Sequence, residues 1–138
     1  RKARLHIVPP DSVLIVTRGM ILAHSVPTAV TERGVTINQD MKAILPSPEV
    51  DPVFLKTCLD VQKSDILSVV SVSAHGTRRL DKEGIASIQI LRPPIERQYH
   101  FRDTYKAKRH LRCKQAKHLS RLKISFDALT QRAFKGEL

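Results

Sequence analysis

The feature that most constrains the fold of this chain is a run of forty residues, 95–134, without glycine or proline. Such a run predicts one continuous α-helix, about 60 Å long at the usual rise per residue. Pro93-Pro94 marks its beginning, since proline suits a first helical turn, and Gly136 supplies the expected stop. We therefore expect a body, residues 1–94, followed by a helical tail, residues 95–138.

The expected helix carries a coiled-coil pattern in which the spacing of seam positions alternates between four and three. The first half of this seam is polar and the second half is apolar. A lone helix of this length cannot bury the apolar half, so the pattern predicts pairing with another helix, including one from a second copy of the chain. Packing of the seam on the chain's own body is the alternative. Leu119, Leu122, Phe126 and Leu129 are the predicted pairing residues. The seam positions are Phe101, Tyr105, Lys108, Arg112, Gln115, Leu119, Leu122, Phe126, Leu129 and Ala133.

Charge is distributed unequally between the two parts. The chain has 24 Lys and Arg against 13 Asp and Glu, a net charge of +11. The body holds twelve basic and nine acidic residues, whereas the tail holds twelve basic and four acidic residues. Such an excess favours a polyanionic partner, because basic side chains release the counterions of nucleic-acid phosphates. A basic protein that docks on an acidic subunit is the alternative.

The body alternates short β-branched runs with turn residues, which indicates strands. Asp51-Pro52 predicts the start of a helix, with Asp as the N-cap and Pro in the first turn. Residues 81–86 fit a turn or a short helix, and residues 66–72 fit either a helix or a strand. The pattern predicts an α+β protein, with a small mixed β-sheet domain followed by a long coiled-coil-forming α-helix. The expected strands are 13–16, 26–30, 35–37, 41–45 and 87–91.

Cysteine usage and hydropathy exclude several classes of protein. Cys58 and Cys113 form no CxxC or Cys/His ligand spacing, so neither a zinc module nor a disulfide scaffold is indicated. No apolar run is long enough to span a membrane, and no signal peptide is recognisable. We expect a cytoplasmic protein with reduced thiols and without a metal or cofactor.

Two motifs resemble catalytic signatures. Pro10-Asp11 followed by Asp40-Met41-Lys42 matches the PD…(D/E)xK pattern of Mg²⁺-dependent nucleases, which is short enough to arise by chance. Arg92-Pro93-Pro94-Ile95 fails the (N/D/S)-P-P-(Y/F) motif of amino-methyltransferases, because Arg cannot accept a hydrogen bond from the target amine and Ile cannot stack on the base. No glycine-rich nucleotide fingerprint occurs. We therefore expect a non-catalytic chain.

Two clusters in the body are suited to nucleic acid. The first is Thr17-Arg18-Gly19, directly after an expected strand, and the second is the glycine-containing loop 75–82. Arginine can bind guanine in a bidentate manner, and Thr or His can reach other base edges. A solvated turn is the alternative for each cluster. The predicted DNA contacts are Arg18, Arg78, Arg79 and Lys82, with His75 and Thr77 as base readers.

Four motifs follow one another along the chain. Residues 11–19 are similar to the pattern GD(V/I)L…RG, and residues 38–44 are similar to NQDI.AL. Residues 76–98, which include Ile88-Gln89-Ile90-Leu91-Arg92-Pro93-Pro94-Ile95-Glu96-Arg97-Gln98, are similar to G(S/T)…L…I.I.LPPLEEQ, and residues 129–138 to the ending L…AF.GEL. In this order, the set of motifs resembles the specificity subunits of type I restriction–modification enzymes.

The resemblance implies a partial target-recognition domain in residues 1–94 that reads double-stranded DNA, joined to a spacing helix in residues 95–138. It implies DNA-methyltransferase subunits and a restriction subunit as partners. The family's recognition domains carry a further segment before the position of Arg1, so we interpret the chain as a fragment or a truncated gene product. The alternatives are the recognition portion of a fused single-chain restriction–methylation enzyme, and a basic coiled-coil assembly protein that does not bind DNA.

Overall fold

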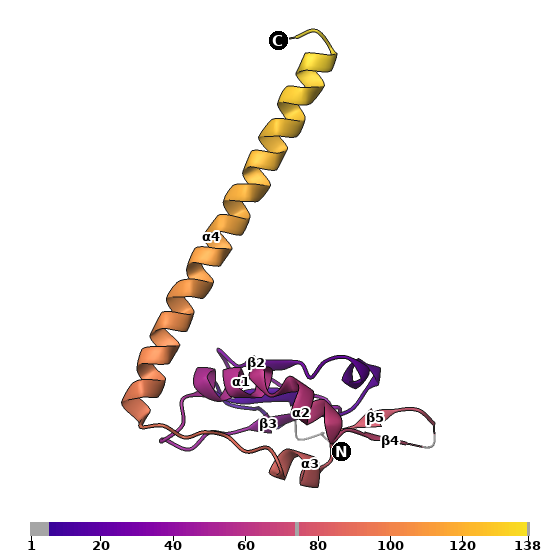
Figure 1. Ribbon diagram of the computed structural model, residues 1–138, viewed down its shortest axis with the longest axis vertical. Coiled ribbons are helices and arrows are strands. Elements are labelled where there is room, and N and C mark those ends of the chain that lie inside the picture. The colour runs from indigo at the N-terminus through magenta and orange to yellow at the C-terminus, as the bar shows by residue number, and fades with distance from the viewer. Residues whose placement is uncertain (1–5, 74, 138) are drawn as a thin grey trace. The chain divides into compact units, whose positions relative to one another are not determined.

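The computed structural model describes residues 6–73 and 75–137. The first five residues, Ala74 and Leu138 lie outside the described part, and with them the last residue of the family-like ending. By its internal packing the chain forms two units, residues 1–100 and residues 101–138 (Figure 1). Small sheets and short helices make up the first unit, and a long helix makes up the second, which confirms the α+β class.

The first sheet has three antiparallel strands in the order β2-β1-β3. These are β1 (Val13–Val16), β2 (Thr28–Val30) and β3 (Met41–Ile44), and a 3₁₀-helix, η1 (Met20–Ala23), lies between the first two in sequence. The central strand β1 alternates buried and half-buried residues, with Val13 and Ile15 fully buried. This period of two matches a strand that buries one face of a small sheet.

Helices cover the sheet and complete the core. Helix α1 (Pro52–Val61) packs on β2 and β1, and α2 (Lys63–Ser68) follows it directly. Asp51 caps α1 as predicted, because its carboxylate accepts hydrogen bonds from the backbone N–H groups of Val53 and Phe54. The buried aliphatic core consists of Val13, Ile15, Leu22, Val26, Leu55, Leu59, Ile66 and Leu80.

The second sheet is a two-stranded antiparallel hairpin of β4 (Ser71–Val72) and β5 (Arg78–Arg79). The ambiguous stretch 66–72 therefore ends α2 and then forms a strand. Helix α3 (Lys82–Ala86) confirms the short helix expected after it, and Asp81 caps it through Gly84 N–H.

Both sheets are antiparallel, whereas the sequence analysis expected a mixed sheet. A parallel pair needs a long crossover connection, usually a helix. Helices α1 and α2 follow the third strand, so no βαβ crossover exists within the first sheet.

Two expected strands do not form. Residues 35–37 contribute only an isolated antiparallel bridge, in which Val8 and Val35 exchange two backbone hydrogen bonds. Residues 88–91 have no regular secondary structure; Ile88 and Ile90 pack against the core as their alternation indicated, yet these residues pair with no strand in the described part of the chain. An apolar period of two reports burial on one face and not the presence of a hydrogen-bonding partner. The 26–30 strand is confirmed only at residues 28–30.

Helix α4 (Ile95–Phe134) has the predicted forty residues. Its end is a Schellman-type turn, in which Glu137 N–H donates to Arg132 O and Gly136 N–H donates to Ala133 O. The four predicted pairing residues are 51–69% exposed. No helix in the described part of the chain is long and apolar enough to cross a membrane.

The first turn of α4 is fixed to the body by a fully buried glutamine. Gln98 is 0% exposed, and its carbonyl oxygen accepts a 2.9 Å hydrogen bond from the Asp51 backbone N–H. Its amide nitrogen donates to the backbone oxygens of Glu49 and Pro93, at 3.0 and 2.8 Å. One side chain thus joins the residue that caps α1 to the chain that enters α4.

Candidate nucleic-acid interface

The two basic clusters identified in the sequence lie side by side. Beyond β1 the chain continues through Thr17 to Gly19 and pairs with β5: Leu80 N–H donates to Thr17 O at 2.9 Å, and Gly19 N–H donates to Arg78 O at 3.0 Å. These two bonds flank an antiparallel bridge between Arg18 and Arg79. Strand β5 is therefore held between β4 on one side and the end of β1 on the other.

Arg18 and Arg79 project from the same face. The pattern of flanking bonds makes them a non-hydrogen-bonded pair, in which the Cα atoms are about 4.5 Å apart and both side chains point the same way. Their neighbours Thr17 and Leu80 are buried, whereas both arginines are exposed, so the pair points to solvent. Two guanidinium groups are thus presented at one spot.

These guanidinium groups are not neutralised by a carboxylate of the described residues. Within residues 6–73 and 75–137, Arg18, Arg78 and Arg79 take part in no ion pair. Like charges placed directly opposite each other across a strand pair destabilise the sheet. An anion at this position would relieve that repulsion.

The hairpin turn holds the other predicted contacts. Ser73 N–H donates to Thr77 O, and Gly76 N–H donates to Ser73 O, which closes the turn. Gly76 has a φ of 77°, a conformation that favours glycine. His75 is exposed and Thr77 is half-buried in this turn.

The remaining predicted contacts lie at different positions around the pair. Arg78 alternates with Arg79 and is half-buried, on the same side of the strand as buried Leu80. Lys82 is exposed in the first turn of α3. The structure therefore brings Arg18 and Arg79 together, whereas Arg78 and Lys82 lie beside them. Their roles in binding stay predictions.

Three residues beside the arginine pair were not predicted from the sequence as part of this surface. Ser71 is paired with Arg79 from the β4 side, and its hydroxyl donates to Arg79 O at 3.0 Å. Met20, in η1, is 67% exposed, and Val72, in β4, is 57% exposed. Both residues lie next to the basic residues. No local pattern marks these residues, because only the long-range pairing of β5 brings them to this surface.

The carboxylates of the nuclease-like pattern do not meet. Asp11 precedes β1, and Asp40 precedes β3, which runs antiparallel to β1 with Val16 opposite Met41. The two aspartates therefore lie at opposite ends of β1, roughly 20 Å apart at the usual rise of a strand. One Mg²⁺ ion cannot bind both carboxylates at that separation. No cluster of three potential metal ligands occurs among the residues that the structure describes.

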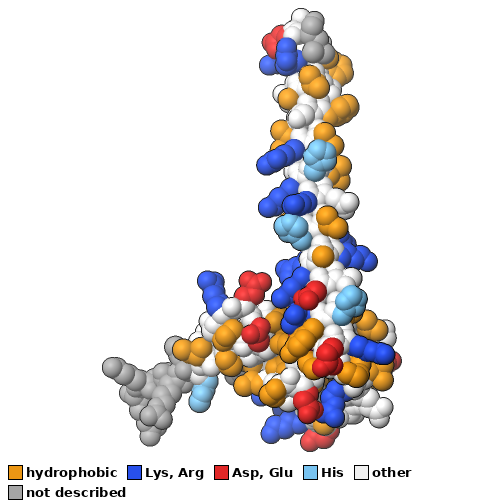
Figure 2. Space-filling model, turned by 90° about the vertical axis from the view of Figure 1, so that its left-hand side faces the viewer, with side chains coloured by type: hydrophobic (Ala, Val, Ile, Leu, Met, Phe, Trp, Pro, Cys, Tyr) orange, Lys and Arg blue, Asp and Glu red, His pale blue; other side chains and the backbone are white. Residues whose placement is uncertain are grey.

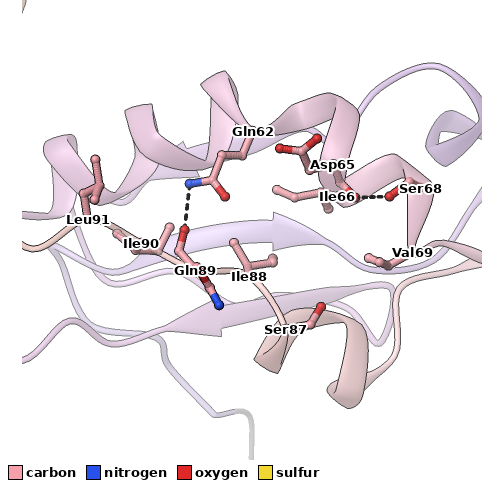
Figure 3. A pocket seen from close by; sticks show the side chains of 10 residues that line it. All are labelled: Gln62, Asp65, Ile66, Ser68, Val69, Ser87, Ile88, Gln89, Ile90 and Leu91. Carbon is pink, nitrogen blue, oxygen red and sulfur yellow. Dashed lines mark hydrogen bonds between the residues drawn. The ribbon is translucent and has the colours of Figure 1, made fainter.

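A groove of about 560 Å³ lies between α2 and residues 87–91 (Figure 3). Gln62 donates to Gln89 O at 2.9 Å across it, as the dashed line in the figure shows. Asp65 supplies the one charged side chain in its lining, which contains no basic residue. Its chemistry therefore suits neither a phosphate backbone nor nucleophilic catalysis.

The thiol of Cys58 is also unsuited to catalysis. Burial in α1 raises the pKa of this thiol above its usual value. A catalytic cysteine requires the opposite shift, because the thiolate is the nucleophile.

The chain is 29% identical over 92 residues to the type I restriction enzyme EcoR124I/EcoR124II specificity subunit of Escherichia coli. This chain is a distant homologue of that specificity subunit. The match covers 67% of this chain and 23% of the relative, so the chain corresponds to less than a quarter of that protein. No family model matches the chain.

Proposed function

We propose that this chain binds double-stranded DNA sequence-specifically as part of a type I specificity subunit, without catalysing a reaction itself. The observation that carries the proposal is the exposed Arg18–Arg79 pair, which forms no ion pair with the residues that the structure describes. Arginine pairs of this kind suit phosphate oxygens and guanine edges. The distant homology supplies the biological context.

The proposal includes partners that a specificity subunit requires. Methyltransferase and restriction subunits would be directed to a bipartite DNA site by the recognition domain, and the apolar seam of α4 would pair with another helix. The relative is named as a specificity subunit, which favours this arrangement over a fused restriction–methylation enzyme. We place the complex in the cytoplasm, where bacterial DNA is accessible.

The first test compares two exposed arginines of the same body, Arg79 and Arg33. Changing Arg79→Gln should reduce the slope of log affinity against log salt by about 0.9 for duplex DNA if Arg79 binds a phosphate. If Arg79 reads a base, the loss should be about 1–3 kcal/mol on the cognate site of the complete subunit, and one base position should become less specific. Fluorescence anisotropy at several salt concentrations measures both effects. Arg33 lies in the turn before Val35, and the matched change Arg33→Gln should alter neither the salt slope nor the affinity for the cognate site.

The stability of the same variants separates binding from folding. Because Arg79 faces a like charge, Arg79→Gln should leave the free energy of unfolding unchanged or raise it by a few tenths of a kcal/mol. If the double variant Arg18→Gln with Arg79→Gln keeps its DNA affinity and salt slope, the two arginines lie in a solvated turn. The proposed interface would then be wrong.

A further inference from the structure

Helix α4 has a basic face that the recognition body and the apolar seam do not explain. Between Asp103 and Asp127 the sequence contains eight Lys and Arg, two His and no acidic residue. At 100° per residue, six of these side chains fall on the side of the helix opposite the apolar seam. All six are exposed. We call this set the basic stripe; it consists of Lys106, Arg109, His110, Lys114, Lys117 and Arg121.

In Figure 2, Lys and Arg side chains project on the left of the middle of α4, and hydrophobic side chains lie mainly along the right of its upper half. Histidine side chains lie on both sides. Within the described part of the chain, no stripe residue forms an ion pair. Like charges spaced three or four residues apart on a helix destabilise it by about 0.2–0.5 kcal/mol per pair. An anionic partner would offset that repulsion.

The chemistry of the stripe narrows the choice of partner. A second copy of the chain is unsuitable, because its α4 offers no run of acidic residues to complement the stripe. The stripe runs from residue 106 to residue 121, about 22 Å, which matches roughly six base-pair steps of duplex. It contains three lysines, two arginines, one histidine and no Phe, Tyr or Trp, and lysine binds phosphate as a point charge without bidentate base recognition.

We propose that the basic stripe of α4 binds the phosphate backbone of duplex DNA without sequence preference, as a second contact surface distinct from the Arg18–Arg79 pair. This inference rests on the proposed function, since it assumes that the chain meets DNA. It assigns the two faces of α4 different tasks: the seam pairs with a helix, and the stripe holds a stretch of duplex whose sequence is not read.

The experiment uses two variants with equal charge changes on one helix. The stripe variant carries Lys114→Gln, Lys117→Gln and Arg121→Gln. The seam-side variant carries Lys108→Gln, Arg112→Gln and Lys123→Gln, which also replaces two lysines and one arginine. Glutamine keeps helix propensity close to that of lysine and arginine, and circular dichroism verifies the helix.

The measured quantity is the affinity of the full chain for random-sequence duplex between about 50 and about 200 mM salt. The stripe variant should lower the slope of log affinity against log salt by about 2–3, and the seam-side variant by less than about 1. Equal losses in both variants would mean that diffuse charge attracts DNA, and no loss in the stripe variant would mean that the stripe makes no contact. Either result overturns the inference.

Two further measurements distinguish this inference from an acidic protein partner and from the proposed function. The first is competition by poly-L-glutamate for binding to the chain. If it competes as well as duplex DNA does, and the stripe variant binds neither, the partner is an acidic protein surface and the assignment to DNA is overturned. The double variant Arg18→Gln with Arg79→Gln tests the proposed function independently. If it binds like the unchanged chain while the stripe variant loses its slope, the recognition site is wrong and the stripe assignment stands.

Discussion

Replacing Gln98 with alanine is expected to lower the free energy of unfolding of the body by about 3–5 kcal/mol. Gln98 is fully buried and makes three hydrogen bonds, all to backbone groups. Alanine removes all three bonds: the buried Asp51 N–H loses its acceptor, and the carbonyl oxygens of Glu49 and Pro93 lose the donor of two part-buried bonds. A buried N–H left without a partner costs about 1–3 kcal/mol, and each of the other lost bonds about 0.5–1.5 kcal/mol.

Hydrogen exchange of the β1 and α1 amides, followed by mass spectrometry, measures the change because these elements belong to the core. The control is Arg97→Ala, a neighbouring exposed position in the same helical turn. It should change the free energy of unfolding by no more than about 0.5 kcal/mol. If Gln98→Ala and Arg97→Ala have equal effects, the hydrogen bonds of Gln98 do not stabilise the body.

An isosteric change at the same position adds a pH dependence. In Gln98→Glu a carboxylate would face the Glu49 and Pro93 carbonyl oxygens in a buried site, so its folded pKa should lie above the unfolded value of about 4.3. A raised folded pKa means that stability is retained below about pH 4.3 and is lost as the pH rises through the folded pKa. The difference in stability between this variant and the unchanged chain should therefore grow toward neutral pH. A difference that does not vary with pH would contradict the burial of this side chain.

Replacing both Leu122 and Phe126 with alanine should abolish most self-association of the chain. Both side chains are more than half exposed on α4, in the apolar half of the seam. If two copies pair there, each lost site costs about 2–5 kcal/mol. Even the lower value, about 2 kcal/mol, corresponds to a dissociation constant that is about thirtyfold higher. Analytical ultracentrifugation over a range of concentrations measures the shift toward monomer.

Charge on the same helix predicts how the copies pair. In a parallel pair the polar seam positions Lys108 and Arg112 would face copies of themselves. An antiparallel pair that overlaps only at the apolar half, residues 119–133, keeps these charges apart. We therefore expect the antiparallel arrangement.

Ile124 provides a matched control for the seam variant. It is 66% exposed on the same helix but lies on the side opposite the seam, so Ile124→Ala should leave self-association unchanged. A chain that is monomeric both before and after the Leu122 and Phe126 changes would show that the seam does not pair with a second copy.

The helix boundaries were predictable because they depend on local chemistry. Three local features set these boundaries, and each acts only on residues nearby in sequence. They are the stretch without glycine or proline, the carboxylate before Pro52 and the glycine at position 136. The ends of α4 and the cap of α1 were therefore correct. Strand β1 was also correct, because its β-branched run is bounded by turn residues.

Strand pairing was less predictable because the partner of a strand is distant in sequence. Residues 87–91 alternate like a strand, and Ile88 and Ile90 are half-buried, yet they pair with no strand in the described part of the chain. Residues 35–37 form a single bridge, from Val35 to Val8, and no ladder. Periodicity describes which face is buried, and the geometry of the neighbours decides whether a ladder forms.

The sequence by itself determined the class of the fold, the long helix with its apolar seam, and the chemical character of the basic clusters. These properties follow from residue type and local spacing. Only the tertiary structure decided that Arg18 faces Arg79, that the two aspartates of the nuclease-like pattern lie at opposite ends of β1, and that Gln98 is buried. Each of these depends on backbone hydrogen bonds or packing between residues far apart in the chain, which local patterns do not encode.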